Sequence, residues 1–271
     1  MNVISNSKFI AEGVLSWRRT SPREFYDSQE PGPASRMNVK EKIRETIKSF
    51  LGISMLEREI KGLRTNDLSL ELDRRALCSS AEFIEKHMQK ATALKSNLEV
   101  IDFALNKIQH EGMYCEFGVY QGNTLNYTAR KIKSTIYGFD SFKGLPEFWR
   151  DGFPAGRFGI DTDNLPRCEK NVELIVGWFE ETLPSFVIKH PGPVAFLHID
   201  CDLYSSTRTI FEKIGPRIGR GSVLVFDEYF NYPGWPDHEH KAFNEFIHDT
   251  GHKFEFLCYN RFHEQVAVQI L

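Results

Sequence analysis

Short apolar runs alternate with helical patterns over the second half of the chain. Five runs have the composition of buried strands, at 113–117, 136–140, 172–176, 194–200 and 222–227. Between them, apolar residues recur every three or four positions near 124–132, 180–189 and 205–218, which predicts helices. Continuous apolar strands that are separated by helices indicate a parallel sheet with both faces covered.

The last part of the chain departs from this alternation. After a helix near 238–250, strands near 254–258 and 266–270 follow with no helix between them. Such neighbours pair most simply as antiparallel strands. The predicted fold is therefore α/β: a Rossmann-like, doubly wound, mostly parallel sheet of seven strands with an antiparallel C-terminal pair.

The region before the first strand is predicted to be helical. The apolar positions Val39, Ile43, Ile47 and Phe50 begin one or two amphipathic helices that continue through Leu63. These helices would form a dimer contact, cap a substrate or pack on their own domain. A second helical pattern continues to Leu94 and follows a segment that resembles a capping box, Ser79-Ser-Ala-Glu82.

A third helical pattern, over 98–108, leads directly to the first buried strand. Residues 1–36 show no sustained period and contain a Pro-Gly-Pro break, so we expect a flexible N-terminal arm. The predicted organisation is an arm over 1–36, a helical extension or cap over 37–96 and the main domain over 97–271.

The amino-acid composition is that of a globular protein and argues against nucleic-acid-binding and membrane-spanning classes. The 271 residues are 41% hydrophobic and 26% charged, as in an ordinary globular protein, and the net charge of −3 argues against a general nucleic-acid binder. No apolar run approaches the length of about 18 residues that would suggest a membrane span. The five cysteines are scattered and form no Cys-x-x-Cys pair, so we expect reduced thiols and a cytoplasmic protein.

The segment 113–125 carries the first candidate site. Its strand ends in an acid, Glu116, and Gly118 and Gly122 then let the backbone turn and approach a bound molecule closely. The N-terminus of the following helix offers unpaired N–H groups, and Glu116 can accept hydrogen bonds from a cationic or hydroxyl-bearing ligand. This pattern is typical of a nucleotide-type site, although a tight strand-to-helix connection has the same appearance.

Acids close four of the predicted parallel strands. They are Glu116, Asp140, Asp200 and Asp227. Ligands of open α/β sheets bind outside the carboxyl ends of the strands, so we expect these acids to converge on one rim. Asp140 ends the second strand, where an acid typically binds the hydroxyls of a ribose; the alternative is a helix cap.

Two of these strand ends carry a pair of acids, Asp200-Cys-Asp202 and Asp227-Glu228. Carboxylate oxygens suit Mg²⁺, and less well Ca²⁺ or Mn²⁺. If Asp200, Asp227 and Glu228 held the metal, Asp202 would remain free to take a proton from a substrate hydroxyl. His198 lies on the same strand face as Asp200, but we expect it to be a packed core histidine.

With these residues placed, the chain resembles the class I S-adenosylmethionine-dependent methyltransferases, and specifically the macrocin O-methyltransferase family of sugar-tailoring enzymes. The resemblance extends from about Phe83 to Leu271. It rests on five blocks in the family order, at 115–123, 138–146, 177–184, 198–207 and 227–229.

The resemblance implies roles for individual residues. The cofactor's methionine part would lie on Glu116, Phe117, Gly118, Gly122, Asn123 and Thr124, its ribose on Asp140, and its adenine beside Ser141, Phe142, Gly177, Trp178 and Phe179, with Asp200 also at the cofactor. Asp200, Asp227 and Glu228 match the family's metal positions, and Asp202 its proposed general base. The family usually has Asp-Asp where this chain has Asp227-Glu228, which puts the metal geometry in doubt.

The activity implied is in-line transfer of the sulfonium methyl group of S-adenosyl-L-methionine to a hydroxyl, with Mg²⁺ and with Asp202 and Asp200 in catalytic roles. The aromatic, glycine-bearing segment 146–158 would be a mobile lid over the acceptor or an ordered surface loop. The segment 229–240, with Trp235, His238 and His240, is expected to form the other acceptor wall.

Three functions remain after this comparison. The leading hypothesis is a homodimeric O-methyltransferase of a sugar or another hydroxylated small molecule, in natural-product or glycan tailoring. The alternative is an S-adenosylmethionine-binding protein without transfer activity, which acts through its N-terminal helices. A nicotinamide-dependent oxidoreductase is disfavoured because the turn at Gly118 lacks Gly-x-Gly-x-x-Gly.

Overall fold

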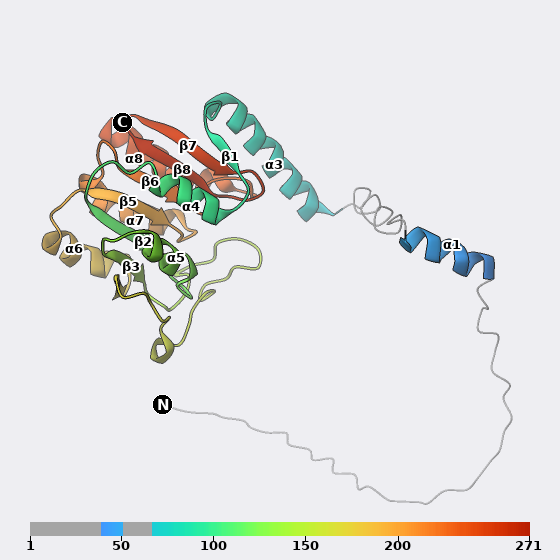
Figure 1. Ribbon diagram of the computed structural model, residues 1–271, viewed down its shortest axis with the longest axis horizontal. Helices are drawn as coiled ribbons and strands as arrows, with labels where there is room; N and C mark the ends of the chain where they lie inside the picture. The colour runs from blue at the N-terminus through green and yellow to red at the C-terminus, as the bar shows by residue number, and fades with distance from the viewer. Residues whose placement is uncertain (1–38, 51–66) are drawn as a thin grey trace, which may run out of the picture. The chain divides into compact units, whose positions relative to one another are not determined.

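The computed structural model describes residues 39–50 and 67–271 (Figure 1). The chain divides into two units, Met1–Thr65 and Asn66–Leu271. In the first unit the described element is α1 (Val39–Phe50), which agrees with the start of the predicted amphipathic pattern. The expected arm over 1–36 and the rest of that pattern, from Leu56 to Leu63, lie outside the described residues.

The second unit is built on one mixed sheet (Figure 1). Its strands are β1 (Thr92–Leu94), β2 (Met113–Phe117), β3 (Ile136–Asp140), β4 (Val172–Val176), β5 (Val194–Ile199), β6 (Val223–Phe226), β7 (Phe254–Asn260) and β8 (Val266–Ile270). Their order across the sheet is β1-β7-β8-β6-β5-β2-β3-β4. Strands β2 to β6 are parallel, and β8 runs antiparallel to both β6 and β7, so the predicted topology is confirmed.

The sheet has eight strands where seven were predicted. The additional strand is β1, which pairs in parallel with β7 at the edge. The sequence pattern had placed Ala91 and Leu94 on a helix, and this prediction is wrong. The helix ends at His87, and the chain then extends along the free edge of β7, whose unpaired backbone groups bind it.

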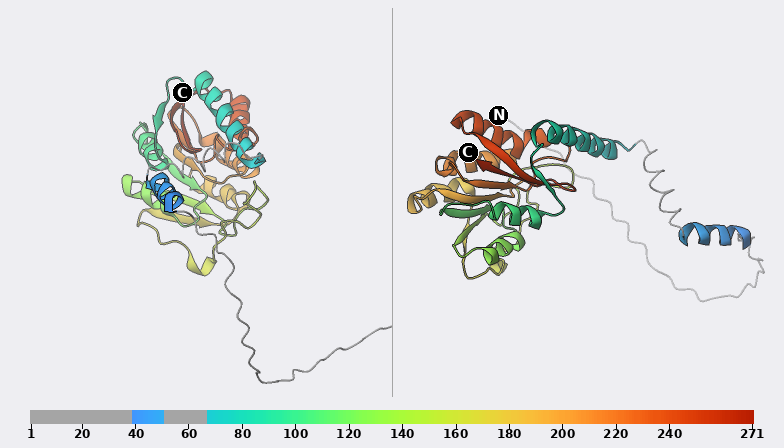
Figure 2. Two further views of the ribbon diagram at one scale, coloured as in Figure 1. Left: turned by 90° about the vertical axis from the view of Figure 1, so that its right-hand side faces the viewer. Right: turned by 45° about the horizontal axis from the view of Figure 1, so that its top comes forward.

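Helices cover both faces of the sheet, as Figures 1 and 2 show. One face carries α4 (Asn97–Leu105), which packs on β6, β7 and β8, and α5 (Asn123–Lys131), which packs on β3 and β4. On the other face α6 (Phe179–Lys189), α7 (Tyr204–Ile214) and α8 (Glu239–Thr250) pack in that order. Short 3-10 turns occupy Thr162–Asn164, Gly215–Arg217 and Trp235–Asp237. The central strands β5 and β6 are therefore buried throughout.

Helix α3 (Leu68–His87) begins earlier than the sequence pattern indicated. Asp67 is its N-cap and accepts hydrogen bonds from the backbone N–H groups of Ser69 and Leu70. Ser79 therefore lies inside the helix, and the capping-box prediction is wrong. The Ser79 hydroxyl instead accepts a hydrogen bond of 3.0 Å from the Trp235 indole N–H, which joins α3 to the segment after β6.

Two further expectations concern the whole chain. Within residues 39–50 and 67–271, no helix is long and apolar enough to cross a membrane. All five cysteines are free, as predicted.

Candidate functional site

The turn between β2 and α5 is packed tightly against the end of β5. Gly118 has a φ of +93°, and a Cβ at this position would overlap the carbonyl oxygen of Asp200. The Asp200 N–H donates to the Phe117 carbonyl oxygen at 2.8 Å, and the Gly118 N–H donates to the Phe139 carbonyl oxygen at 2.9 Å. The glycine therefore allows three strand ends to meet at one point of the rim.

The Asp140 carboxylate connects the loops that follow β2 and β3. One oxygen accepts hydrogen bonds from the backbone N–H groups of Val119 and Tyr120, both at 2.8 Å, and the other accepts from Phe142 at 2.7 Å. Asp140 thus caps local backbone, which the sequence left as an alternative to ligand binding. Both roles are compatible, because a carboxylate has about four lone-pair sites and three are used.

A cavity of about 570 Å³ opens at the carboxyl ends of the parallel strands. Nine predicted site residues line it: Gly118, Asp140, Ser141, Trp178, Phe179, Asp200, Asp202, Asp227 and Glu228. The predicted convergence of acids on one rim is confirmed for Asp140, Asp200 and Asp227. We refer to this space as the larger cavity.

Seven predicted site residues do not line the larger cavity: Glu116, Phe117, Gly122, Asn123, Thr124, Phe142 and Gly177. Phe117 is buried and stacks on Phe139 at a centroid distance of 4.7 Å, and Phe142 is buried in the core near α5. The Glu116 carboxylate is fully buried, with one oxygen bonded to the Thr124 hydroxyl. The Glu116 side chain at the end of β2 thus points into the protein, because its buried contacts fix that conformation.

A second cavity, of about 480 Å³, shares Phe158, Asp202, Asp227 and Glu228 with the larger one. Its other walls are aromatic and polar: Lys95, Ser96, Asn97, Trp149, Arg150, Phe153, Asn260, His263, Glu264 and Gln265. We refer to it as the second cavity. The two spaces therefore meet at the acids that follow β5 and β6.

The loop 146–158 forms one wall of the second cavity and is anchored by Arg150. The Arg150 guanidinium pairs with both oxygens of Glu264, at 3.1 and 3.3 Å, and its carbon lies 3.9 Å from the centroid of the Trp149 ring. Glu264 belongs to the hairpin between β7 and β8, so this contact joins the loop to the opposite wall. This ion pair therefore anchors the loop at Arg150, and its predicted mobility stays a prediction.

The segment 229–240 does not form the acceptor wall that the sequence suggested. Trp235 and His240 pack edge-on against Phe83 of α3, with ring centroids 5.5 and 5.3 Å away. None of the residues 229–240 lines either cavity. The polar hairpin residues Asn260, His263, Glu264 and Gln265 occupy that place instead.

Burial and mutual repulsion perturb the pKa values of the acids at the junction of the two cavities. Asp202 is 6% exposed and has a φ of +64°, and burial followed by the nearby Asp227 charge raises its pKa to about 7. Burial and Asp227 also raise the pKa values of Asp200 and Glu228 well above their usual range. Like charges that are buried together favour a bound cation.

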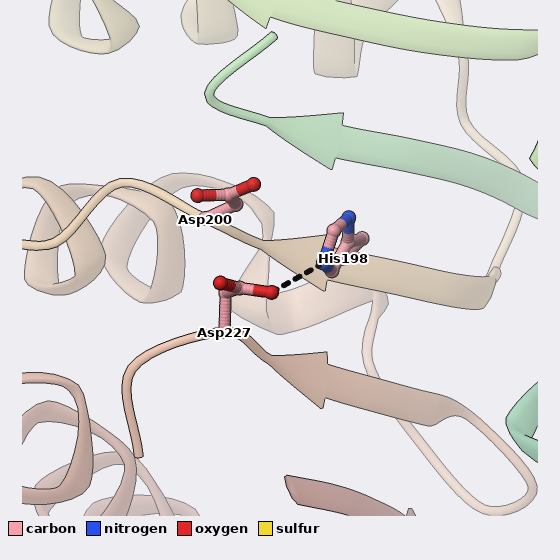
Figure 3. Close-up of side chains that lie close together, drawn as sticks. All are labelled: His198, Asp200 and Asp227. Carbon is pink, nitrogen blue, oxygen red and sulfur yellow. Dashed lines mark ion pairs between the residues drawn. The ribbon is translucent and has the colours of Figure 1, made fainter. Parts of the chain in front are cut away.

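His198 lies beside two of these acids, Asp200 and Asp227, as Figure 3 shows. Candidate ligand atoms of His198, Asp200 and Asp227 all lie within 4.8 Å of one another. Glu228, which was predicted to be the third ligand, is not in this group, whereas His198 is. His198 is fully buried, as expected for a core residue, but its position beside two strand-end acids was missed.

Neighbouring groups adjust the charge of the imidazole and of Asp227. Burial alone lowers the pKa of His198, but Glu116 and Asp227 outweigh burial and raise it well above its ordinary value. Burial alone raises the pKa of Asp227, but the His198 ring and the Gln265 amide outweigh it and lower the pKa. Gln265 donates to one Asp227 oxygen at 3.0 Å, which orients the other toward the histidine.

This rim lies in a segment that is similar to a known protein family. Residues 115–229 match a family model described as a methyltransferase domain. The match covers 115 of the 271 residues. Its bounds include all of the predicted site residues and the shared acids of the two cavities.

Two curated relatives are O-methyltransferases. This chain is 28% identical over 120 residues to demethyldecarbamoylnovobiocin O-methyltransferase of Streptomyces niveus, covering 38% of this chain and 45% of that protein. It is 26% identical over 141 residues to 8-demethyl-8-(2,3-dimethoxy-alpha-L-rhamnosyl)-tetracenomycin-C 4'-O-methyltransferase of Streptomyces olivaceus, covering 44% and 53%. The chain thus spans about half the length of these relatives. The predicted relationship to S-adenosylmethionine-dependent O-methyltransferases is confirmed at modest identity.

A solved structure shares the fold. The crystal structure of CalS11, calicheamicin methyltransferase, superposes with a TM-score of 0.53 at 23% identity and covers 64% of this chain and 78% of that one. At this identity the likeness shows that the two proteins share a fold.

Several cavity residues escaped the sequence analysis. Tyr120, Glu147, Ser205, Ser206 and Thr209 line the larger cavity, and Lys95, Asn97 and the hairpin 260–265 line the second. Tyr120 stands between the two glycines of the turn, which was a usable signal. The hairpin carried no comparable signal, because only the strand order brings β7 and β8 beside β6.

Proposed function

We propose that this protein is an S-adenosyl-L-methionine-dependent O-methyltransferase that methylates a hydroxyl of a sugar or another hydroxylated small molecule. The observation that carries the proposal is the meeting of two cavities at Asp202, Asp227 and Glu228. A transferase of this kind needs separate spaces for donor and acceptor with the reacting atoms at their junction.

The larger cavity suits the cofactor. Its volume of about 570 Å³ is in the range of small-molecule sites. The free lone pair of Asp140 can accept from a ribose hydroxyl, and Trp178 and Phe179 provide apolar surface for adenine. The backbone at Gly118 lines this cavity and would hold the methionine part.

The second cavity suits a hydroxylated acceptor. Trp149, Phe153 and Phe158 offer apolar ring faces, and Asn97 and Asn260 offer amide groups that both donate and accept hydrogen bonds. This combination matches the apolar faces and hydroxyl edges of a sugar ring. The two curated relatives, whose names describe O-methyltransferases, support the same class of reaction.

The chain's own groups can perform the proton transfer. Bound S-adenosylmethionine would supply the methyl group and leave as S-adenosylhomocysteine, and the Asp202 carboxylate, which lines both cavities, would take the proton of the acceptor hydroxyl. A divalent cation, predicted as Mg²⁺, would lower the pKa of the acceptor hydroxyl when bound at Asp200 and Asp227. The mutual repulsion of these acids supports such a cation. A cytoplasmic homodimer remains the prediction for location and assembly.

Two measurements test the proposal. Calorimetry with S-adenosylmethionine, with Mg²⁺ and with chelator, tests the cofactor site, and transfer of a labelled methyl group to a panel of sugars and glycosides tests the reaction. We expect Asp202→Asn to bind the cofactor but to transfer at least about 100-fold more slowly, because it lacks the base. Asp151→Asn, at an exposed position, is the matched control.

Two outcomes would contradict the proposal. Failure to bind S-adenosylmethionine under either condition rejects the cofactor. Binding without transfer to any acceptor favours the alternative, a binding protein that acts through its N-terminal helices.

A further inference from the structure

The two nitrogens of His198 have different environments. Nδ1 lies 2.9 Å from one oxygen of Glu116, whose other oxygen accepts from the Thr124 hydroxyl at 2.9 Å. In the tautomer in which Nδ1 donates this hydrogen bond to Glu116, the lone pair of Nε2 is free to bind a ligand. Both the imidazole and the Glu116 carboxylate are fully buried, which fixes the orientation of the ring.

The other nitrogen, Nε2, is buried and has no hydrogen-bond partner. Its nearest charged neighbour is Asp227 Oδ1 at 3.8 Å, the contact drawn as a dashed line in Figure 3. This distance exceeds the range of a hydrogen bond. Nε2 is therefore a buried nitrogen without a hydrogen-bond partner that lies beside the carboxylates of Asp200 and Asp227, and a cation bound between these groups would satisfy it.

We propose that His198 Nε2 is a metal ligand, together with Asp200 and Asp227, for a divalent first-row transition metal. The donor atoms lie within 4.8 Å of one another. Around a six-coordinate ion, ligand atoms at about 2.1 Å are separated by roughly 3 Å for neighbours and about 4.2 Å across the ion. The three groups thus stand within small side-chain adjustments of a coordination sphere.

The surroundings of these ligands support the assignment. Glu116 holds the imidazole through Nδ1, and Gln265 holds Asp227 through Oδ2, as outer partners do at metal sites that bind histidine and carboxylate. Glu228 lies outside this group of donor atoms, and its backbone N–H donates to the buried Glu239 carboxylate at 3.1 Å. Its side-chain Oε2 is also buried without a hydrogen-bond partner, so Glu228→Gln tests whether it binds the metal in place of His198.

The donor set also selects the kind of metal. Mg²⁺ and Ca²⁺ prefer oxygen ligands alone, whereas one imidazole with two carboxylates suits Mn²⁺, Fe²⁺, Co²⁺ or Zn²⁺. This inference specifies which kind of cation the proposed function would use. It rests on the proposed function only in assuming that a cation binds at this rim.

Manganese is the probe for the test. Mn²⁺ is titrated into the full chain after chelator treatment, and free ion is counted by electron paramagnetic resonance. Pulsed measurements on the bound ion then detect nitrogen coupling from a directly ligated imidazole. We expect nitrogen coupling in the wild type, affinity at least about tenfold lower in His198→Gln and in Asp227→Asn, and near wild-type affinity with intact coupling in Glu228→Gln.

Each outcome bears on the ligand set. Bound Mn²⁺ without nitrogen coupling, or a Glu228→Gln loss as large as that of Asp227→Asn, overturns the assignment. Nitrogen coupling in the wild-type spectrum decides whether His198 is a ligand even if His198→Gln does not fold. Glu116→Gln keeps the imidazole but weakens the hydrogen bond that orients it, and should reduce the affinity for Mn²⁺ about tenfold. Methyl transfer is not measured, so absence of Mn²⁺ binding overturns this inference and leaves the proposed function to its own test.

Discussion

Replacing Asp140 tests whether one carboxylate both shapes the rim and binds the cofactor. In Asp140→Ala three backbone N–H groups lose their acceptor: those of Val119, Tyr120 and Phe142. Tyr120 is 39% exposed, so water can replace its partner, whereas Val119 and Phe142 are 4% and 1% exposed. The main cost therefore comes from two N–H groups that remain buried.

The magnitude follows from these two groups. A hydrogen bond to a charged group contributes about 1.5–3 kcal/mol, and a buried N–H left without a partner costs a similar amount. We expect Asp140→Ala to lower the free energy of unfolding by about 3–5 kcal/mol. Asp140→Asn keeps one acceptor oxygen for Val119 and Tyr120 but turns its amide toward the Phe142 N–H, so about 1.5–3 kcal/mol should be lost.

The assay is urea unfolding followed by circular dichroism, with calorimetry of S-adenosylmethionine on the same samples. Asp161→Ala is the matched control, because Asp161 is exposed and accepts from the Asp163 N–H at 3.0 Å in a similar local turn. Its effect should stay near 0.5 kcal/mol, as for other surface changes. If Asp140→Ala is as stable as this control, the carboxylate does not hold the two loops. If it is destabilised but binds cofactor normally, Asp140 is only a structural cap.

Three further predictions concern other parts of the domain. Gly118→Ala should cost about 3 kcal/mol or more in urea unfolding, because its Cβ would overlap the Asp200 carbonyl oxygen at a φ of +93°; wild-type stability would contradict this packing. Arg150→Met leaves the partly buried Glu264 without its cation, and we expect a lower urea midpoint of unfolding and a higher KM for the acceptor. Adding Glu264→Gln should largely restore both values. A double variant that is not restored would refute the role of the Arg150–Glu264 pair as the anchor of the loop. Burial lowers the pKa of His240 from its usual 6.5, so the unfolded chain binds a proton at this imidazole more readily than the folded chain does. The free energy of unfolding should therefore fall as the pH drops below about 6.5. In urea unfolding, His240→Phe should flatten this dependence on pH, and an unchanged dependence would exclude His240 as its source.

Local pattern was sufficient for most of the sheet. Strands 136–140 and 172–176 were predicted with their observed bounds, because each is a short, mostly apolar segment with polar residues or glycine on both sides. The alternation with helices also implied parallel strands, and parallel strands place their carboxyl ends on one edge. For that reason Asp140, Asp200 and Asp227 could be expected to share a rim before any contact was known.

Tertiary packing decided what each group on the rim contacts. Glu116 was expected at the ligand, but the neighbouring strand β5 places His198 beside it, so its carboxylate turns inward. Likewise β1 has no strand signal of its own and forms because β7 leaves an open edge. Periodicity specifies which residues share a face, but the partner across the sheet depends on strand order, which only the folded chain establishes. The histidine between two acids and the hairpin wall of the second cavity are products of that order.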